Sequence, residues 1–134
     1  MTEYIHKRAL RIIYESYEIP LSGLLDLDSS VSIHTKNLYT LLLEIFKSIN
    51  GKNPILISEC FLFKDMTYPL RKTELLILSK TKTDNYGLNY VLFRGCLLWN
   101  YLPDNINKAG SIKQFKERLA LWRGLKCSCK ICKF

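Results

Sequence analysis

The spacing of hydrophobic residues predicts that most of this chain is helical. The strongest pattern runs from Ser32 to Asn50, where apolar side chains recur every three or four residues and form one wide face. The hydroxyl group of Ser30 or Ser32 can cap the start of this helix, and Asn50-Gly51 supplies the left-handed backbone that ends many helices. The sequence therefore predicts one long amphipathic helix here.

A second clear helix is predicted to begin at Ser111. Ser111 and Gln114 fit a capping box, in which the hydroxyl and the amide satisfy free backbone N–H groups of the first turn. Leu121 is predicted to point away from the apolar face, which consists of Ile112, Phe115, Leu119 and Trp122. Phe115 and Trp122 are therefore predicted to pack in the core instead of stacking on nucleobases.

Three weaker helical signals accompany these two. An apolar stripe near the start is predicted to face a core, and Pro20 ends that helix or starts a short apolar turn after it. Pro54 is predicted to open another short helix. The residues of the stripe are Ile5, Ala9, Ile12, Ile13 and Ser16.

The stretch between Tyr68 and Phe93 breaks the helical pattern. Its apolar residues lack a clear helical period, Thr83 to Gly87 has turn chemistry, and Tyr90 to Phe93 is rich in strand-forming residues. These features predict a small β-hairpin or a pair of short strands. The predicted fold is α+β and mainly helical, with four to five helices, a small hairpin and one domain over residues 1–124.

Composition supports an ordinary globular protein. Of the 134 residues, 48% are hydrophobic and 24% are charged, which argues against disorder throughout the chain. Neither a signal peptide nor a run of about 18 apolar residues is present, so a membrane-spanning helix is not expected. The odd number of cysteines, five, favours free thiols in a reducing compartment. We expect an intracellular protein, nuclear or cytoplasmic, that is not secreted.

Positive charge is concentrated near the end of the chain. The formal net charge is +8, and residues 105–134 carry eight basic side chains against one acidic side chain. This asymmetry predicts an anionic partner such as RNA or DNA. The alternative is a solvated helix flank. The side chains predicted to contact phosphates are Lys113, Lys116, Arg123, Lys126, Lys130 and Lys133, with Lys7, Arg8 and Arg11 as a second set.

A basic, cysteine-rich tail is predicted for residues 125–134. Cys127, Cys129 and Cys132 lie within six residues, and thiolates at such spacing bind zinc. Zinc is therefore the candidate cofactor, although a structural site needs four ligands. The fourth could come from elsewhere in the chain only if the tail folds back, from Cys60, Cys96, His6 or His34. The alternative is a reduced, frayed tail.

Five sequence elements, in order, resemble the C-terminal region of jockey-like non-LTR retrotransposon reverse transcriptases. That region follows the polymerase domains, and the resemblance extends over roughly the whole chain. The family's tails also often end in a cysteine-rich cluster. The matching elements are the K-R-A-L-R helix at Lys7 to Arg11, the helix and turn from Asn37 to Pro54, T-x-x-Y-G at Thr83 to Gly87, G-x-x-L-W-N-x-L-P at Gly95 to Pro103, and S-x-x-x-F-K at Ser111 to Lys116.

The resemblance implies a fragment of an RNA-directed DNA polymerase without its catalytic core. Such polymerases hold two magnesium ions with clustered Asp carboxylates, and no Asp-Asp pair occurs in this chain. Asp26 and Asp28 are predicted to form a solvated turn. We expect no enzymatic activity from this chain and no small-molecule substrate. The expected role is sequence-independent contact with RNA or DNA, with upstream polymerase domains as further partners. The alternatives are a domesticated or decayed protein-interaction scaffold, or a small zinc-binding module.

Overall fold

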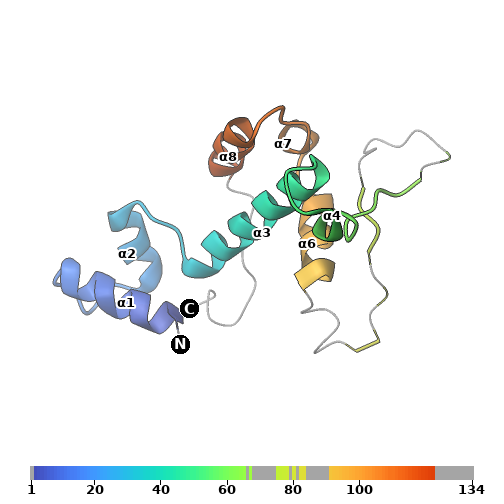
Figure 1. The fold of residues 1–134 in the computed structure, drawn as a ribbon. Coiled ribbons are helices and arrows are strands. Elements are labelled where there is room, and N and C mark those ends of the chain that lie inside the picture. Colours follow the sequence, from blue (N-terminus) through green and yellow to red (C-terminus); the bar gives the residue numbers. More distant parts are fainter. Residues whose placement is uncertain are drawn as a thin grey trace. The chain divides into compact units, whose positions relative to one another are not determined.

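The computed structural model describes residues 2–65, 67, 75–78, 80, 82–83 and 91–122, and this part of the chain is helical without regular strands. The helices fall into two compact units, which comprise residues 1–39 and 40–122 of the chain (Figure 1). The helices are α1 (Thr2–Ile13), α2 (Leu21–Asp28), α3 (Ile33–Ile49), α4 (Ile55–Ser58), α6 (Val91–Tyr101), α7 (Asp104–Asn107) and α8 (Ile112–Leu121). The prediction of a mainly helical fold is confirmed, but the described residues form seven helices instead of the predicted four to five. The predicted single domain over residues 1–124 stays a prediction.

The first unit is built on the packing of α1 against α2. Leu10 of α1 is buried against Leu21 and Leu24 of α2, and Ile19 and Leu25 cover the edge of this small cluster. After α1 ends, the backbone of Glu15 takes a left-handed conformation (φ 49°), which lets the chain reverse toward α2. The apolar contact is therefore small and local.

The predicted inward stripe of α1 is wrong. Ile5 and Ile12 are each 60% exposed and Ile13 is 67% exposed, whereas Glu3 and Leu10 are buried. Glu3 and Leu10 lie seven residues apart and thus share one face of the helix. That face is turned inward because the Glu3 carboxylate has a backbone partner there.

The long helix α3 confirms the strongest sequence prediction. At its start, the Ser32 hydroxyl accepts a hydrogen bond from the Thr35 N–H (3.2 Å), as a capping residue does. The Glu3 carboxylate accepts a second one from the His34 N–H (3.0 Å), which explains why this acidic side chain is only 4% exposed. At the other end Gly51 has the predicted left-handed backbone (φ 67°). Residues of α3 from Thr40 onward belong to the second unit.

Aromatic rings form the centre of the second unit. The ring of Phe46 on α3 stacks on Phe115 of α8, with centroids 4.4 Å apart, and the ring centroid of Trp99 on α6 lies 6.1 Å from that of Phe115. All three side chains are almost completely buried. The prediction that Phe115 packs in the core is confirmed.

Helix α6 replaces part of the predicted β-element. Val91 to Phe93 were expected to form a strand, but they make the first turn of α6. Their strand propensity is overridden because the residues that follow form a helix that packs against α3. Gly95 allows the close approach, since a Cβ at this position would lie 2.8 Å from Cδ1 of Ile45.

The remaining β-prediction is also wrong for the described residues. Phe63 and Leu76 form an isolated antiparallel bridge, with the Ile77 N–H donating to the Leu62 carbonyl. On its other edge, the Leu76 segment pairs with a side chain. The Asn100 amide on α6 accepts from the Leu76 N–H (2.8 Å) and donates to the Leu76 carbonyl (2.9 Å), taking the place of a neighbouring strand. The predicted turn at 84–87 lies outside the described residues.

Prolines and a serine fix the starts of the shorter helices. Pro54 and Pro103 precede α4 and α7 directly, which confirms the short helix predicted after Pro54. At the start of α8 the Ser111 hydroxyl accepts from the Gln114 N–H (3.2 Å), as the capping box predicts. The returning Gln114 side chain accepts from the Gly110 N–H instead of that of Ser111. Among the helices of the described segments, none has the length and apolar character to span a membrane.

Candidate nucleic-acid interface

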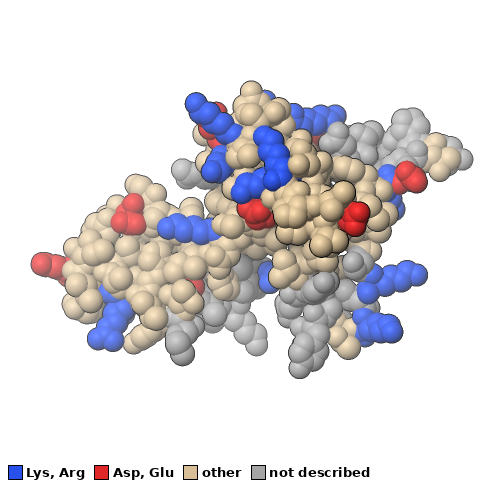
Figure 2. Space-filling model, in the orientation of Figure 1, with Lys and Arg blue, Asp and Glu red and all other residues tan. Residues whose placement is uncertain are grey.

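Residues 104–122, the α7–α8 segment, carry the cationic surface of the second unit. Figure 2 shows Lys and Arg side chains projecting where Figure 1 places α7 and α8. The acidic side chains of this segment are Asp104 and Glu117. Its basic side chains are Lys108, Lys113, Lys116 and Arg118.

Lys113 and Lys116 lie on one flank of α8, as predicted. They are three residues apart, so their side chains are neighbours on the helix surface. Phe115 and Leu119 hold the opposite side of α8 in the core, which leaves both lysines exposed. Within the described ranges the ion pairs are His6–Glu3 and Lys47–Glu44, so neither lysine is neutralised there by a carboxylate. Both ammonium groups can meet an external anion.

Arg118 joins this surface although it was not among the predicted contact residues. One of its terminal nitrogens donates to the backbone carbonyl of Asn105, which anchors the guanidinium between α8 and α7. A neutral carbonyl leaves the positive charge of Arg118 in place, and guanidinium has five N–H donors. The sequence could not reveal this contact because it depends on how α7 packs beside α8.

The second predicted set lies in the first unit. Lys7, Arg8 and Arg11 share one side of α1, but only Arg8 is fully exposed. The Arg11 Nε atom is buried without a hydrogen-bond partner in the described part of the chain. Residues 1–39 also contain five acidic side chains against four basic ones. This set is thus a weaker anion surface than the α7–α8 segment.

The other predicted contact and metal residues lie outside the described residues. These are Arg123, Lys126, Lys130 and Lys133 for phosphates, and Cys127, Cys129 and Cys132 for zinc. Both predictions stay predictions.

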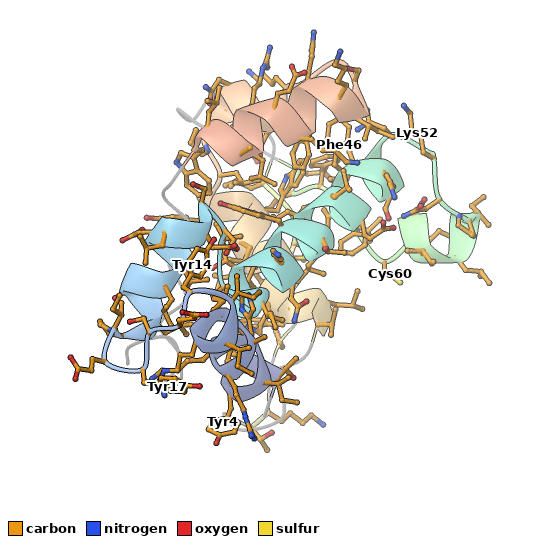
Figure 3. All side chains as sticks on the ribbon, turned by 90° about the vertical axis from the view of Figure 1, so that its left-hand side faces the viewer. Tyr4, Tyr14, Tyr17, Phe46, Lys52 and Cys60 are labelled. Atoms are coloured by element: carbon orange, nitrogen blue, oxygen red, sulfur yellow. The ribbon has the colours of Figure 1, made fainter. Side chains whose placement is uncertain are left out.

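The two cysteines considered as a fourth zinc ligand differ in their surroundings. Cys60 is exposed after α4 (Figure 3). Cys96 is buried on α6, and burial raises the pKa of its thiol. Because zinc binds the thiolate, Cys96 is the poorer ligand.

Asp26 and Asp28 are exposed as expected, but they lie in the last turn of helix α2 and not in a separate turn. Hydrogen bonds from Ser30 and from the Tyr14 hydroxyl (3.0 Å) lower the pKa of Asp28. The hydrogen bond between Tyr14 and Asp28 also raises the pKa of Tyr14. In the portion of the chain that is described, no three His, Cys, Asp or Glu side chains are grouped so as to hold a metal ion.

Searches against known protein families, curated proteins and solved structures gave no match to this chain.

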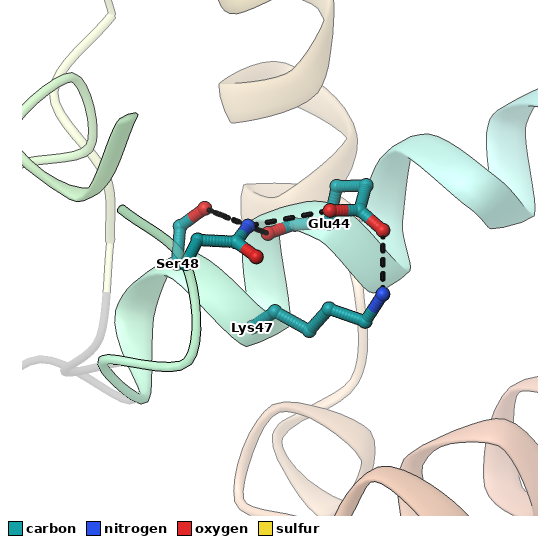
Figure 4. Close-up of polar contacts among 4 residues, drawn as sticks. Glu44, Lys47 and Ser48 are labelled. Carbon is teal, nitrogen blue, oxygen red and sulfur yellow. Dashed lines mark hydrogen bonds and ion pairs between the residues drawn. The ribbon is translucent and has the colours of Figure 1, made fainter. Parts of the chain in front are cut away.

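A polar cluster at the end of α3 gives one further lysine, Lys47, an acidic partner. The Lys47 ammonium donates to the Glu44 carboxylate (2.7 Å), and the Asn53 amide donates to Glu44 and to the Ser48 hydroxyl (2.9 Å) (Figure 4). Asn53 thereby ties the turn that follows α3 back onto the helix. Lys47 already has an acidic partner and is not part of the cationic surface.

This cluster predicts a pH dependence of stability. Hydrogen bonding from Lys47, and then from Asn53, lowers the pKa of Glu44 below its ordinary value of 4.5. A carboxyl group with a lowered pKa in the folded state stabilises the fold above its unfolded pKa, and the contribution is lost as the pH falls through the folded value. Because Glu44 is half-exposed, the contribution is at most about 0.5 kcal/mol.

Glu44→Gln tests that contribution. In urea unfolding at about pH 6, wild type should be more stable than Glu44→Gln, and the difference should vanish by about pH 3. A difference that stays constant over this range would contradict the assigned role of the carboxylate.

Proposed function

We propose that this chain binds RNA or DNA through its phosphates, without reading sequence, as the post-polymerase segment of a non-LTR retrotransposon reverse transcriptase. The observation that carries the proposal is the pair of exposed α8 lysines, Lys113 and Lys116, which have no acidic partner in the described structure. The order of the five sequence elements supports the family assignment.

Counterion release is the physical basis of the proposed binding. Each lysine or arginine that contacts a phosphate displaces condensed cations from the nucleic acid, so affinity falls as salt rises. Such contacts need only positive charge and reach, and they give affinity without sequence preference. Lys113 and Lys116 would act together with Arg123, Lys126, Lys130 and Lys133, and Lys7, Arg8 and Arg11 would add a weaker set.

The proposed role is binding and not catalysis. A polymerase of the resembled family needs clustered Asp carboxylates for magnesium, and the chain has no Asp-Asp pair. In a complete element, chemistry would belong to the upstream polymerase domains. Zinc bound by Cys127, Cys129 and Cys132 would order the basic tail, and metal content measured with and without the last eight residues tests that part.

A paired-charge experiment tests the proposed surface. Lys113→Gln/Lys116→Gln removes two α8 lysines, and Lys80→Gln/Lys82→Gln removes two other exposed lysines of the same unit. Each single-strand phosphate contact contributes about −0.7 to the slope of log affinity against log salt. The α8 variant should therefore bind a fluorescent single strand more weakly, with a slope about 1.4 units shallower, whereas the control should keep the wild-type slope. Equal behaviour of the two variants would show that α8 is not the contact surface.

A second candidate function, protein docking, is favoured by the apolar side of α1. Ile5, Ile12 and Ile13 are exposed within the first unit, and Leu121 on α8 is 84% exposed, as predicted. Exposed apolar patches commonly mark protein contacts. Concentration-dependent self-association that is indifferent to added nucleic acid would favour docking over the main proposal.

A further inference from the structure

Two aromatic rings meet on the surface of the second unit. Tyr101, the last residue of α6, lies with its ring centroid 6.0 Å from that of Trp122, which caps the end of α8. The rings are tilted by 51°, an arrangement that aromatic pairs favour. Trp122 was predicted to belong to the core, but it is only half-buried. The pair spans the ends of two helices that the Phe115 core holds together.

Tyr101 does not pack in the core of the second unit. Its side chain is 68% exposed, so it contributes far less to folding than the fully buried Trp99 two residues earlier. Its ring nevertheless lies against that of Trp122 and remains open to solvent. An exposed aromatic pair of this kind is suited to binding another flat group.

Positive charge lies beside this aromatic pair. Arg118 lies one helical turn before Trp122, whose backbone N–H donates to the Arg118 carbonyl (3.1 Å). The Asn105 carbonyl fixes the Arg118 guanidinium without neutralising it. No ion pair in the described structure involves Arg118. Aromatic rings next to unpaired cations are the combination with which proteins bind single-stranded nucleic acid.

We infer that Tyr101 and Trp122 form a stacking platform for the bases of a single-stranded nucleic acid, with Arg118 contacting its backbone. This inference rests on the proposed function and narrows it, because bases in a duplex are stacked on one another and cannot reach a surface ring. The lysines of α8 supply affinity for either form, and the aromatic pair supplies the preference for single strands.

Tyr101→Ala tests the platform, with Tyr101→Phe and Tyr17→Ala as controls. Phenylalanine keeps a ring that can stack. Tyr17 is 69% exposed in the first unit, so it matches Tyr101 in exposure (Figure 3). The probes are a labelled oligothymidylate of about 12 nucleotides and a duplex of equal length. Tyr101→Ala should lower single-strand affinity about fivefold to a hundredfold and leave duplex affinity unchanged. Both controls should bind like wild type.

Tryptophan fluorescence gives an independent reading. The chain has two tryptophans, and Trp99 is only 1% exposed, so stacking should quench the emission of Trp122. Oligothymidylate should quench the wild-type signal, and Trp122→Phe should abolish that quenching.

The binding results distinguish a failure of the stacking platform from a failure of the proposed nucleic-acid binding. If Tyr101→Ala binds single strands as wild type does while Lys113→Gln/Lys116→Gln binds them weakly, the platform is wrong and the phosphate contacts stand. An equal loss on single strands and duplex also overturns the platform. If wild type binds neither probe, both ideas fail.

Discussion

Replacing Phe115 with alanine is expected to lower the free energy of unfolding by about 3–5 kcal/mol. Phe115 is fully buried and stacks on Phe46 while also facing Trp99, so the substitution opens a cavity where α3, α6 and α8 meet. A domain of this size has a total stability of about 5–15 kcal/mol, so the loss is a large part of it. Urea denaturation followed by circular dichroism measures it.

Leu121→Ala on the same helix is the matched control. Its side chain is 84% exposed and its loss should change stability by less than about 0.5 kcal/mol. If Phe115→Ala and Leu121→Ala cost the same, the aromatic cluster is not the core of the second unit.

Replacing Asn100 with alanine is expected to cost about 2–4 kcal/mol. The substitution removes both hydrogen bonds between the Asn100 amide and the backbone of Leu76, a residue that is only 1% exposed. Each backbone group left without a partner then carries its desolvation penalty. The Leu76 amide should also exchange its hydrogen faster, because the segment then keeps its bridge to Phe63 but loses its hydrogen bonds to α6.

Asn105→Ala removes the same amide group from an exposed position on α7 and should be nearly neutral. If the two asparagine substitutions lower the free energy of unfolding equally, or if hydrogen exchange at Leu76 is unchanged, Asn100 does not hold the Leu76 segment.

These contacts give a structural reason for the G-x-x-L-W-N-x-L-P element. Gly95 admits Ile45 of α3, Trp99 fills the core, Asn100 holds Leu76, and Pro103 begins α7. Four of its six fixed positions thus have a role in folding.

Helices with a clear capping or stop signal in the sequence could be predicted. The Ser32 cap and Gly51 stop bounded α3, and Ser111 marked the start of α8. Contacts between distant residues could not be predicted in this way. The Glu3 carboxylate caps α3 and so turns the face with Glu3 and Leu10 inward. Packing on α3 makes Val91 to Phe93 helical despite their strand propensity.

In the candidate site, too, local features could be predicted from the sequence and contacts between distant residues could not. The exposure of Lys113 and Lys116 followed from the helical period, because Phe115 and Leu119 fix the buried face of α8. The roles inferred for Arg118 and Tyr101 depend on contacts with Asn105 and Trp122, which helical periodicity does not encode.

The salt dependence of nucleic-acid binding by the whole chain tests the central claim most directly. With about five phosphate contacts, log affinity for a single strand should fall against log salt with a slope near −3.5 between about 50 and 200 mM. Affinity that stays constant over this range would contradict the account, because the unpaired cations of the chain would then have no part in binding.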